Sequence, residues 1–188
     1  MSILPVRVLG DPILRRIAEP VRTITDDLRR LADNMYETMY AAKGIGLAAP
    51  QVGVGERLFI TDVDGARYAI VNPELVSADG EFETSEEGCL SIPEVMADVK
   101  RPSRVVMRGT DLKGEPFTLD ATGLLGRCLL HELDHLNGRL FIDHLSFLKR
   151  RRSLAEWAVH EHEFPGHIRV LTPGDPGDPD RGRGSEDL

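Results

Sequence analysis

The chain has 188 residues, 41% of them hydrophobic and 29% charged, a composition typical of one globular domain with a core of its own. Its formal net charge of −8 argues against nucleic acid as a principal ligand, so no specific nucleic-acid sequence is expected to be recognised. No apolar run approaches the length of a membrane span, and the first residues lack the pattern of a secretion signal or transit peptide.

The first half of the chain predicts one helix followed by strands. A helix is expected after Thr25, a capping residue followed by two acidic residues, and apolar residues then recur at helical spacing as far as Gly44. The runs 57–61 and 67–71 flank Asp64-Gly65 and predict a hairpin. A second hairpin is expected from residues 104–107 and 117–119, on either side of Lys113-Gly114.

The second half predicts two more helices. One contains the apolar run 124–130 and ends at Asn137-Gly138, and the other runs from Ser146 to about Glu163. Strands and helices do not alternate in a β-α-β rhythm, so the expected class is α+β, with antiparallel sheets around a central helix and helices near both chain ends. We expect a single domain over residues 1–164, followed by a flexible tail rich in Pro, Gly and Asp over 165–188.

The segment 131–135 of the expected central helix reads His-Glu-x-x-His. On a helix His131 and His135 share a face, so both imidazoles can reach a single cation. Glu132 is rotated by about 100° from His131 and borders the open coordination position, beside a bound water. The alternative is a pair of structural histidines, with Glu132 paired to an arginine. We favour the metal site, because two unsatisfied imidazoles on so apolar a helix would be costly.

A catalytic metal site usually has a third protein ligand, and the sequence offers two candidates. His144 lies close to the spacing of metzincin proteases, but the glycine of that pattern comes one position early. Cys89 follows a glycine and precedes a nearby proline, which suits a loop that approaches a helix closely. Cys89 could instead be a small buried hydrophobe or form a disulfide with Cys128, although no secretion signal indicates an oxidising compartment.

The segment 44–51, Gly-Ile-Gly-Leu-Ala-Ala-Pro-Gln, is rich in small residues. Glycines let the backbone approach a ligand closely, and the small Ala48 and Ala49 leave it unobstructed. A phosphate-binding loop is disfavoured, because neither G-K-[ST] nor G-x-G-x-x-G is present. Gly44 is also expected to end the preceding helix.

Three segments together resemble, in the right order, the three signature motifs of the peptide deformylase family. They are 44–51, Glu-Gly-Cys-Leu-Ser at 87–91 and His-Glu-Leu-Asp-His-Leu at 131–136. The likeness extends from about Leu9 to Lys149, and three ordered motifs are far more specific than His-Glu-x-x-His alone. One departure is Leu130, where many members carry glutamine before the first metal histidine. That position is not a ligand, so the change bears on the surroundings of the site.

The resemblance implies a metal-dependent hydrolase that removes the formyl group from the N-terminal formylmethionine of newly made proteins and releases formate. It also implies a metal, commonly Fe²⁺, held by Cys89, His131 and His135. A soft thiolate with two imidazoles suits Zn²⁺, Ni²⁺ or Co²⁺ as well, so the ligand types alone do not choose among these metals.

The resemblance further assigns roles around the metal. Glu132 would act as general base and then as general acid. The Gln51 side-chain amide and the Leu90 backbone N–H would donate hydrogen bonds to the developing oxyanion. Gly46 would bind the substrate backbone, and Ile45 would form the edge of the methionine pocket.

Cys128 precedes His131 by three residues and could line the methionine pocket, pack in the core, or do both. Two other functional classes stay open. One is a zincin-type protease with His144 as third ligand, and the other is a relative that binds formylated peptides without turnover.

The implied partners are N-formylmethionyl nascent peptides, in a bacterial-type cytoplasm. The basic stretch 149–152 is either a solvated surface or a transient ribosome contact. His160, Glu161, His162 and His167 resemble a metal cluster, but we interpret them as an exposed helix end beside the tail.

Overall fold

The structure is a computed structural model that describes residues 2–171. Its strands are β1 (Val6–Arg7), β2 (Gly46–Ala48), β3 (Leu58–Val63), β4 (Ala66–Cys89), β5 (Ile92–Thr110), β6 (Pro116–Thr122) and β7 (Ile168–Arg169). Its α-helices are α1 (Asp26–Ala41), α2 (Gly123–Leu136) and α3 (Phe147–His160). Short 3-10 helices lie between them: η1 (Pro12–Arg15), η2 (Ala49–Val52), η3 (Phe141–His144), η4 (Glu161–Glu163) and η5 (Pro165–His167).

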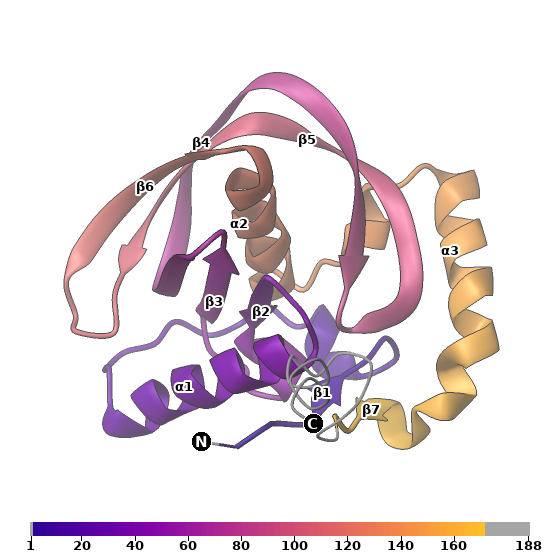
Figure 1. The fold of residues 1–188 in the computed structure, drawn as a ribbon, viewed down its shortest axis with the longest axis horizontal. Helices are drawn as coiled ribbons and strands as arrows, with labels where there is room; N and C mark the ends of the chain where they lie inside the picture. Colours follow the sequence, from indigo (N-terminus) through magenta and orange to yellow (C-terminus); the bar gives the residue numbers. More distant parts are fainter. Residues whose placement is uncertain (1, 172–188) are drawn as a thin grey trace, which may run out of the picture.

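Five strands form one sheet in the order β2-β3-β4-β5-β6, and β1 pairs with β7 in a separate small sheet. Every pairing between these strands is antiparallel. Figure 1 shows β4, β5 and β6 bending as an arch over α2, with α1 below the short strands and α3 to one side. The predicted class, antiparallel sheet with a few helices, is confirmed.

Both predicted hairpins are present. Asp64 and Gly65 join β3 to β4 with φ angles of 51° and 82°, the left-handed conformation that a two-residue hairpin turn requires. Lys113-Gly114 lies in the connection between β5 and β6. These turns were recognisable because their residues tolerate positive φ.

The long hairpin of β4 and β5 was not predicted. The segment 86–93, expected to be a loop, forms the end of β4, a two-residue turn at Leu90-Ser91 and the start of β5. Register shifts interrupt the β4–β5 pairing at four places. Each shift breaks the alternation of inward and outward side chains, so the usual sequence signal for a strand is missing.

The α1 helix begins where predicted, because the Thr25 side chain accepts a hydrogen bond from the Leu28 N–H at 3.2 Å. At its C-terminal end the left-handed residue is Lys43, with φ 54°. The Gly44 N–H still donates to the Met39 carbonyl at 2.8 Å. Gly44 therefore completes the cap as the residue after the left-handed position.

The α2 helix packs its apolar side against the sheet. Leu129, Leu133 and Leu136 share a buried cluster with Phe59 and Val105. A second cluster lies between α1 and strands β2 and β3, and a third joins Trp157 of α3 to residues of β5 and η3. The first of these clusters also includes Ala48 of β2, Ile70 of β4 and Met107 of β5, so it holds α2 against β2 and the β4–β5 hairpin.

The last described residues belong to the folded body. The expected boundary after residue 164 is too early, because η5 and β7 continue the fold and Leu171 is buried. The remainder of the expected tail, 172–188, lies outside the described residues. Within residues 2–171 no helix is both long and apolar enough to cross a membrane.

Candidate metal centre and its cavity

Three predicted ligands meet where the end of β4 reaches α2. The Cys89 Sγ lies 3.2 Å from the His135 Nε2, and one ligand atom from each of Cys89, His131 and His135 lies within 4.8 Å of the others. Over residues 2–171 these three form the only group of this kind. The donor set of one sulfur and two imidazoles suits a divalent transition metal.

The competing assignments for these residues do not fit the structure. The His144 Nε2 lies 2.7 Å from the Asp134 Oδ2 and outside the Cys89–His131–His135 group, which argues against a zincin-type site. Cys89 and Cys128 are both free thiols, so the disulfide considered from the sequence is absent.

The surroundings of Cys89 favour its thiolate. Burial opposes ionisation of the thiol, but the imidazoles of His135 and His131 outweigh it and lower the pKa of Cys89 to about 5. The pKa of His131 is raised despite its burial, through hydrogen bonds to Cys89 and Glu87. A thiolate is the form that a metal ion binds, so this site is prepared for a cation.

A buried carboxylate fixes the orientation of His131. The His131 Nδ1 lies 3.1 Å from the Glu87 Oε2, which leaves the opposite ring nitrogen free to bind a metal. Arg101 donates to both oxygens of Glu87, at 2.6 and 2.9 Å, and Arg127 donates to one at 2.7 Å. Although burial alone would raise the pKa of Glu87, hydrogen bonds from Arg101 and His131 lower it well below its usual value.

Arg101 also connects this group to Asp134, whose Oδ2 accepts a hydrogen bond from the guanidinium at 2.8 Å. From the sequence, Glu87 is recognisable only as part of a motif, and Arg101 and Arg127 are not recognisable as residues of the site. Arg127 precedes His131 by four residues on α2, but its partner Glu87 lies on the β4–β5 hairpin. That hairpin, which brings Arg101 opposite Glu83 and near Glu87, was not predicted. The pKa of Arg101 is raised by Glu87 and Asp134 in spite of burial.

Replacing Arg101 with methionine should leave the buried Glu87 without its main partner and the part-buried Asp134 with His144 alone. Loss of one partner of a buried ion pair costs about 3–5 kcal/mol, and loss of support for a liganding histidine typically weakens metal binding about 10–100-fold. Urea unfolding and metal titration measure the two effects. Arg108→Met is the matched control, because Arg108 pairs with Glu74 at the surface and such pairs contribute about 0–1 kcal/mol. Equal losses in the two variants would contradict this role.

Glu132 is buried next to the three ligands, with 3% of its surface exposed. Burial raises the pKa of Glu132 to about 7. Its Oε2 has no hydrogen-bond partner within residues 2–171. A buried carboxylate oxygen without a partner is costly in a purely structural role, so this atom is available to a bound molecule.

Gly46 brings the backbone of β2 against Glu132. A Cβ atom at this position would lie 2.4 Å from the Glu132 Oε1 and 2.8 Å from the Cys128 Sγ. No side chain fits between them, which explains the glycine on packing grounds alone.

The Gln51 side chain is held from both ends. Its Oε1 accepts a hydrogen bond from the Ala48 N–H at 2.8 Å, and its Nε2 donates to the Ser91 Oγ at 3.2 Å. The same Nε2 lies 3.6 Å from the Cys89 Sγ. Gln51 is 1% exposed, so its amide nitrogen is held beside the candidate metal centre in a fixed orientation.

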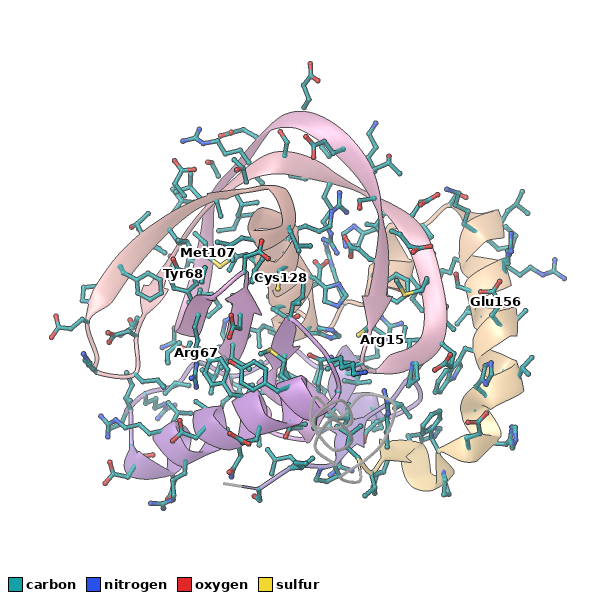
Figure 2. All side chains as sticks on the ribbon, in the orientation of Figure 1. Arg15, Arg67, Tyr68, Met107, Cys128 and Glu156 are labelled. Atoms are coloured by element: carbon teal, nitrogen blue, oxygen red, sulfur yellow. The ribbon has the colours of Figure 1, made fainter. Side chains whose placement is uncertain are left out.

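A cavity of about 540 Å³ opens beside these residues. Its lining includes Ile45, Gly46, Gln51, Leu90, Cys128 and Glu132. Cys128 lies on α2 beneath the strand arch (Figure 2), and its Sγ is 3.6 Å from the Ile45 carbonyl oxygen. Cys89 and His131 also reach the cavity, whereas His135 is enclosed behind them, with 1% of its surface exposed.

Two features noted in the sequence lie away from this cavity. Leu130 packs in the apolar cluster between α2 and the sheet, so the departure from the usual glutamine is accommodated by the core. His160 binds Glu163 at 2.9 Å, and the described residues around it form no group able to hold a metal.

Fold and site together define a class of protein, an α+β chain with a candidate metal site beside a cavity. A Cys/His/His group that could bind a metal and a buried carboxylate lie next to each other there. Residues 3–151 match the family model described as polypeptide deformylase. A curated peptide deformylase from Alkalilimnicola ehrlichii is 51% identical over 156 residues, which cover 81% of this chain and 87% of the relative.

Solved structures agree. A peptide deformylase from Legionella pneumophila superposes with a TM-score of 0.82 at 43% identity, over 86% of this chain and 96% of that one. A Met-Ala-Ser-bound peptide deformylase from Acinetobacter baumannii gives a TM-score of 0.74 at 35% identity, over 76% and 98% of the two chains. The chain belongs to the peptide deformylase family of enzymes.

Proposed function

We propose that this chain removes the formyl group from the N-terminal formylmethionine of newly made proteins and releases formate. The observation that carries the proposal is the buried Glu132 beside the Cys89–His131–His135 group at one cavity. Family membership supports the reaction. The Met-Ala-Ser peptide bound by the Acinetobacter baumannii relative supports a substrate that begins with methionine.

Cys89, His131 and His135 would hold one divalent metal, for which we propose Fe²⁺, with Zn²⁺, Ni²⁺ or Co²⁺ as substitutes in the purified protein. The lowered pKa of Cys89 and the contact of Glu87 with His131 support this ligand set. When bound, such a cation acidifies water and polarises a carbonyl oxygen.

Side-chain and backbone groups of the protein transfer the proton of the attacking water and stabilise the negative charge on the formyl oxygen. Glu132 accepts the proton of the attacking water and later gives it to the departing amine, two tasks that suit a carboxyl with a pKa of about 7. The Gln51 amide and the Leu90 N–H donate to the formyl oxygen as negative charge builds there. Gly46 binds the substrate backbone, while Ile45 and Cys128 contact the methionine side chain.

The direct test is formate release from formyl-Met-Ala-Ser by protein purified without oxygen and analysed for metal. One formate should appear for each free methionine amine, and acetyl-Met-Ala-Ser should react far more slowly. Mass spectrometry separates the alternatives, because a protease would cut between residues and a non-catalytic relative would leave the peptide intact. Absence of formate from metal-loaded protein would end the proposal.

We further propose a transient ribosome contact through the basic stretch Lys149–Arg152 at the start of α3, which would place the reaction in the cytoplasm. Within the described residues Arg150 and Arg152 have acidic partners at 3.2 and 3.0 Å, whereas Arg151 has none. The neighbouring Phe147 is 77% exposed, so apolar and basic groups share this surface.

Charge reversal at Arg151, Arg151→Glu, should lower co-sedimentation with ribosomes by several-fold at low salt. The matched control is Arg30→Glu on α1, an exposed arginine far from α3 in the fold. Equal binding of wild type and Arg151→Glu would exclude this surface.

A further inference from the structure

One wall of the cavity takes no part in the proposed chemistry. Ala42 and Lys43, from the turn after α1, and Arg169, from β7, line it. Leu171, two residues beyond Arg169, packs in a cluster with Ala42 and Leu90. This contact holds the C-terminal segment beside the cavity that Arg169 lines.

The segment that carries Arg169 is firmly attached. Arg169 pairs with Val6 in the β1–β7 sheet, and the Val8 N–H donates to the His167 carbonyl at 3.0 Å. The His167 ring packs so closely over Gly10 that a Cβ there would lie 2.3 Å from it. The position of Arg169 at the cavity is therefore set by the fold.

Cationic and anionic side chains that line the cavity come from different elements of the fold. Over residues 2–171, neither Lys43 nor Arg169 has a carboxylate within salt-bridge distance, whereas Arg127 is engaged by Glu87. The carboxylates of Glu86 and Glu94 belong to the β4–β5 hairpin. Cations that line a cavity without such a partner attract an anionic group of whatever occupies it.

We propose that Lys43 and Arg169 form a cationic subsite that favours peptides with an acidic side chain in the residues after formylmethionine. The inference rests on the proposed function, since it concerns the same cavity. With the formyl group beside Glu132, the chain after methionine must leave through the cavity, past one of its walls. An aspartate or glutamate of the peptide that lies beside Lys43 and Arg169 is attracted by both cations, and a lysine at the same position is repelled by them.

The test compares kcat/KM for formyl-Met-Ala-Glu and formyl-Met-Ala-Lys, and for formyl-Met-Glu-Ala and formyl-Met-Lys-Ala, in the full-length metal-loaded enzyme. In at least one of these pairs the glutamate peptide should be preferred. Arg169→Gln should lower that preference about two- to five-fold, the range of a partly exposed ion pair. Arg169→Lys should restore most of it, and about 0.5 M salt should suppress it in the wild type. Arg151→Gln is the matched control, with the same charge change on α3, outside the cavity lining.

The outcomes separate this inference from the proposed function. If the wild type releases formate but shows no preference in either pair, or if Arg151→Gln lowers the preference as much as Arg169→Gln, the cationic subsite is wrong and the function stands. If no formyl-peptide yields formate, the proposed function fails and the subsite with it.

Discussion

Replacing Glu132 with glutamine should lower kcat/KM for formyl-Met-Ala-Ser by about 10²–10⁴-fold, the contribution typical of a positioned acid–base group. The amide keeps the size of the carboxyl group, so packing against Gly46 is preserved. It cannot accept the proton of the attacking water or return it to the amine. Formate release measures the rate, and metal analysis of the same samples should show unchanged occupancy.

Glu156→Gln is the control for this experiment. It makes the same substitution on α3, where Figure 2 shows Glu156. Glu156 pairs with Arg152 at 3.0 Å, and the variant should leave the rate unchanged. Near-normal turnover by Glu132→Gln with metal bound would refute the assigned role. A loss of rate that follows a loss of metal would instead indicate that Glu132 supports the ligands.

Replacing Cys89 with serine should reduce the bound metal from near one equivalent to near zero and abolish formate release. A serine hydroxyl stays protonated near neutral pH, whereas the neighbouring imidazoles hold the pKa of Cys89 at about 5. The two remaining imidazoles are fewer than the three protein ligands usual in a catalytic site. Metal analysis after dialysis gives the direct measurement.

Two further variants make the Cys89 result specific. Cys128→Ser should keep its metal, because Cys128 lies beside Ile45 and outside the Cys89–His131–His135 group. His144→Ala should keep it too, since His144 binds Asp134. Metal retained by Cys89→Ser and lost by His144→Ala would reverse the assignment and support a zincin-type site.

The candidate ligands were accessible from the sequence because each belongs to a short local pattern. His131 and His135 share a helix face, and the residues around Cys89 form a compact turn. Arg101 and Arg127 were not accessible, since their contacts with Glu87 depend on how α2 meets the bulged β4–β5 hairpin. Ion pairs made by tertiary structure leave no periodic trace in a sequence.

The same difference between local patterns and tertiary contacts explains which parts of the fold could be predicted. Hairpins closed by residues that tolerate positive φ were predicted correctly, as was the helix begun by the Thr25 cap. The boundary at residue 164 was misplaced because the tail was judged by composition. Ile168 and Arg169 are ordered through pairing with β1, at the opposite end of the described chain.

The pairing of β1 with β7 also orders events during synthesis. Val6 leaves the ribosome long before its partner Arg169 is made. Contacts between positions so far apart in the sequence close a long loop and form late. A newly made molecule thus acquires Cys89 and α2 before the wall formed by Arg169, and an enzyme proposed to process emerging chains completes its own cavity only after Arg169 has been added.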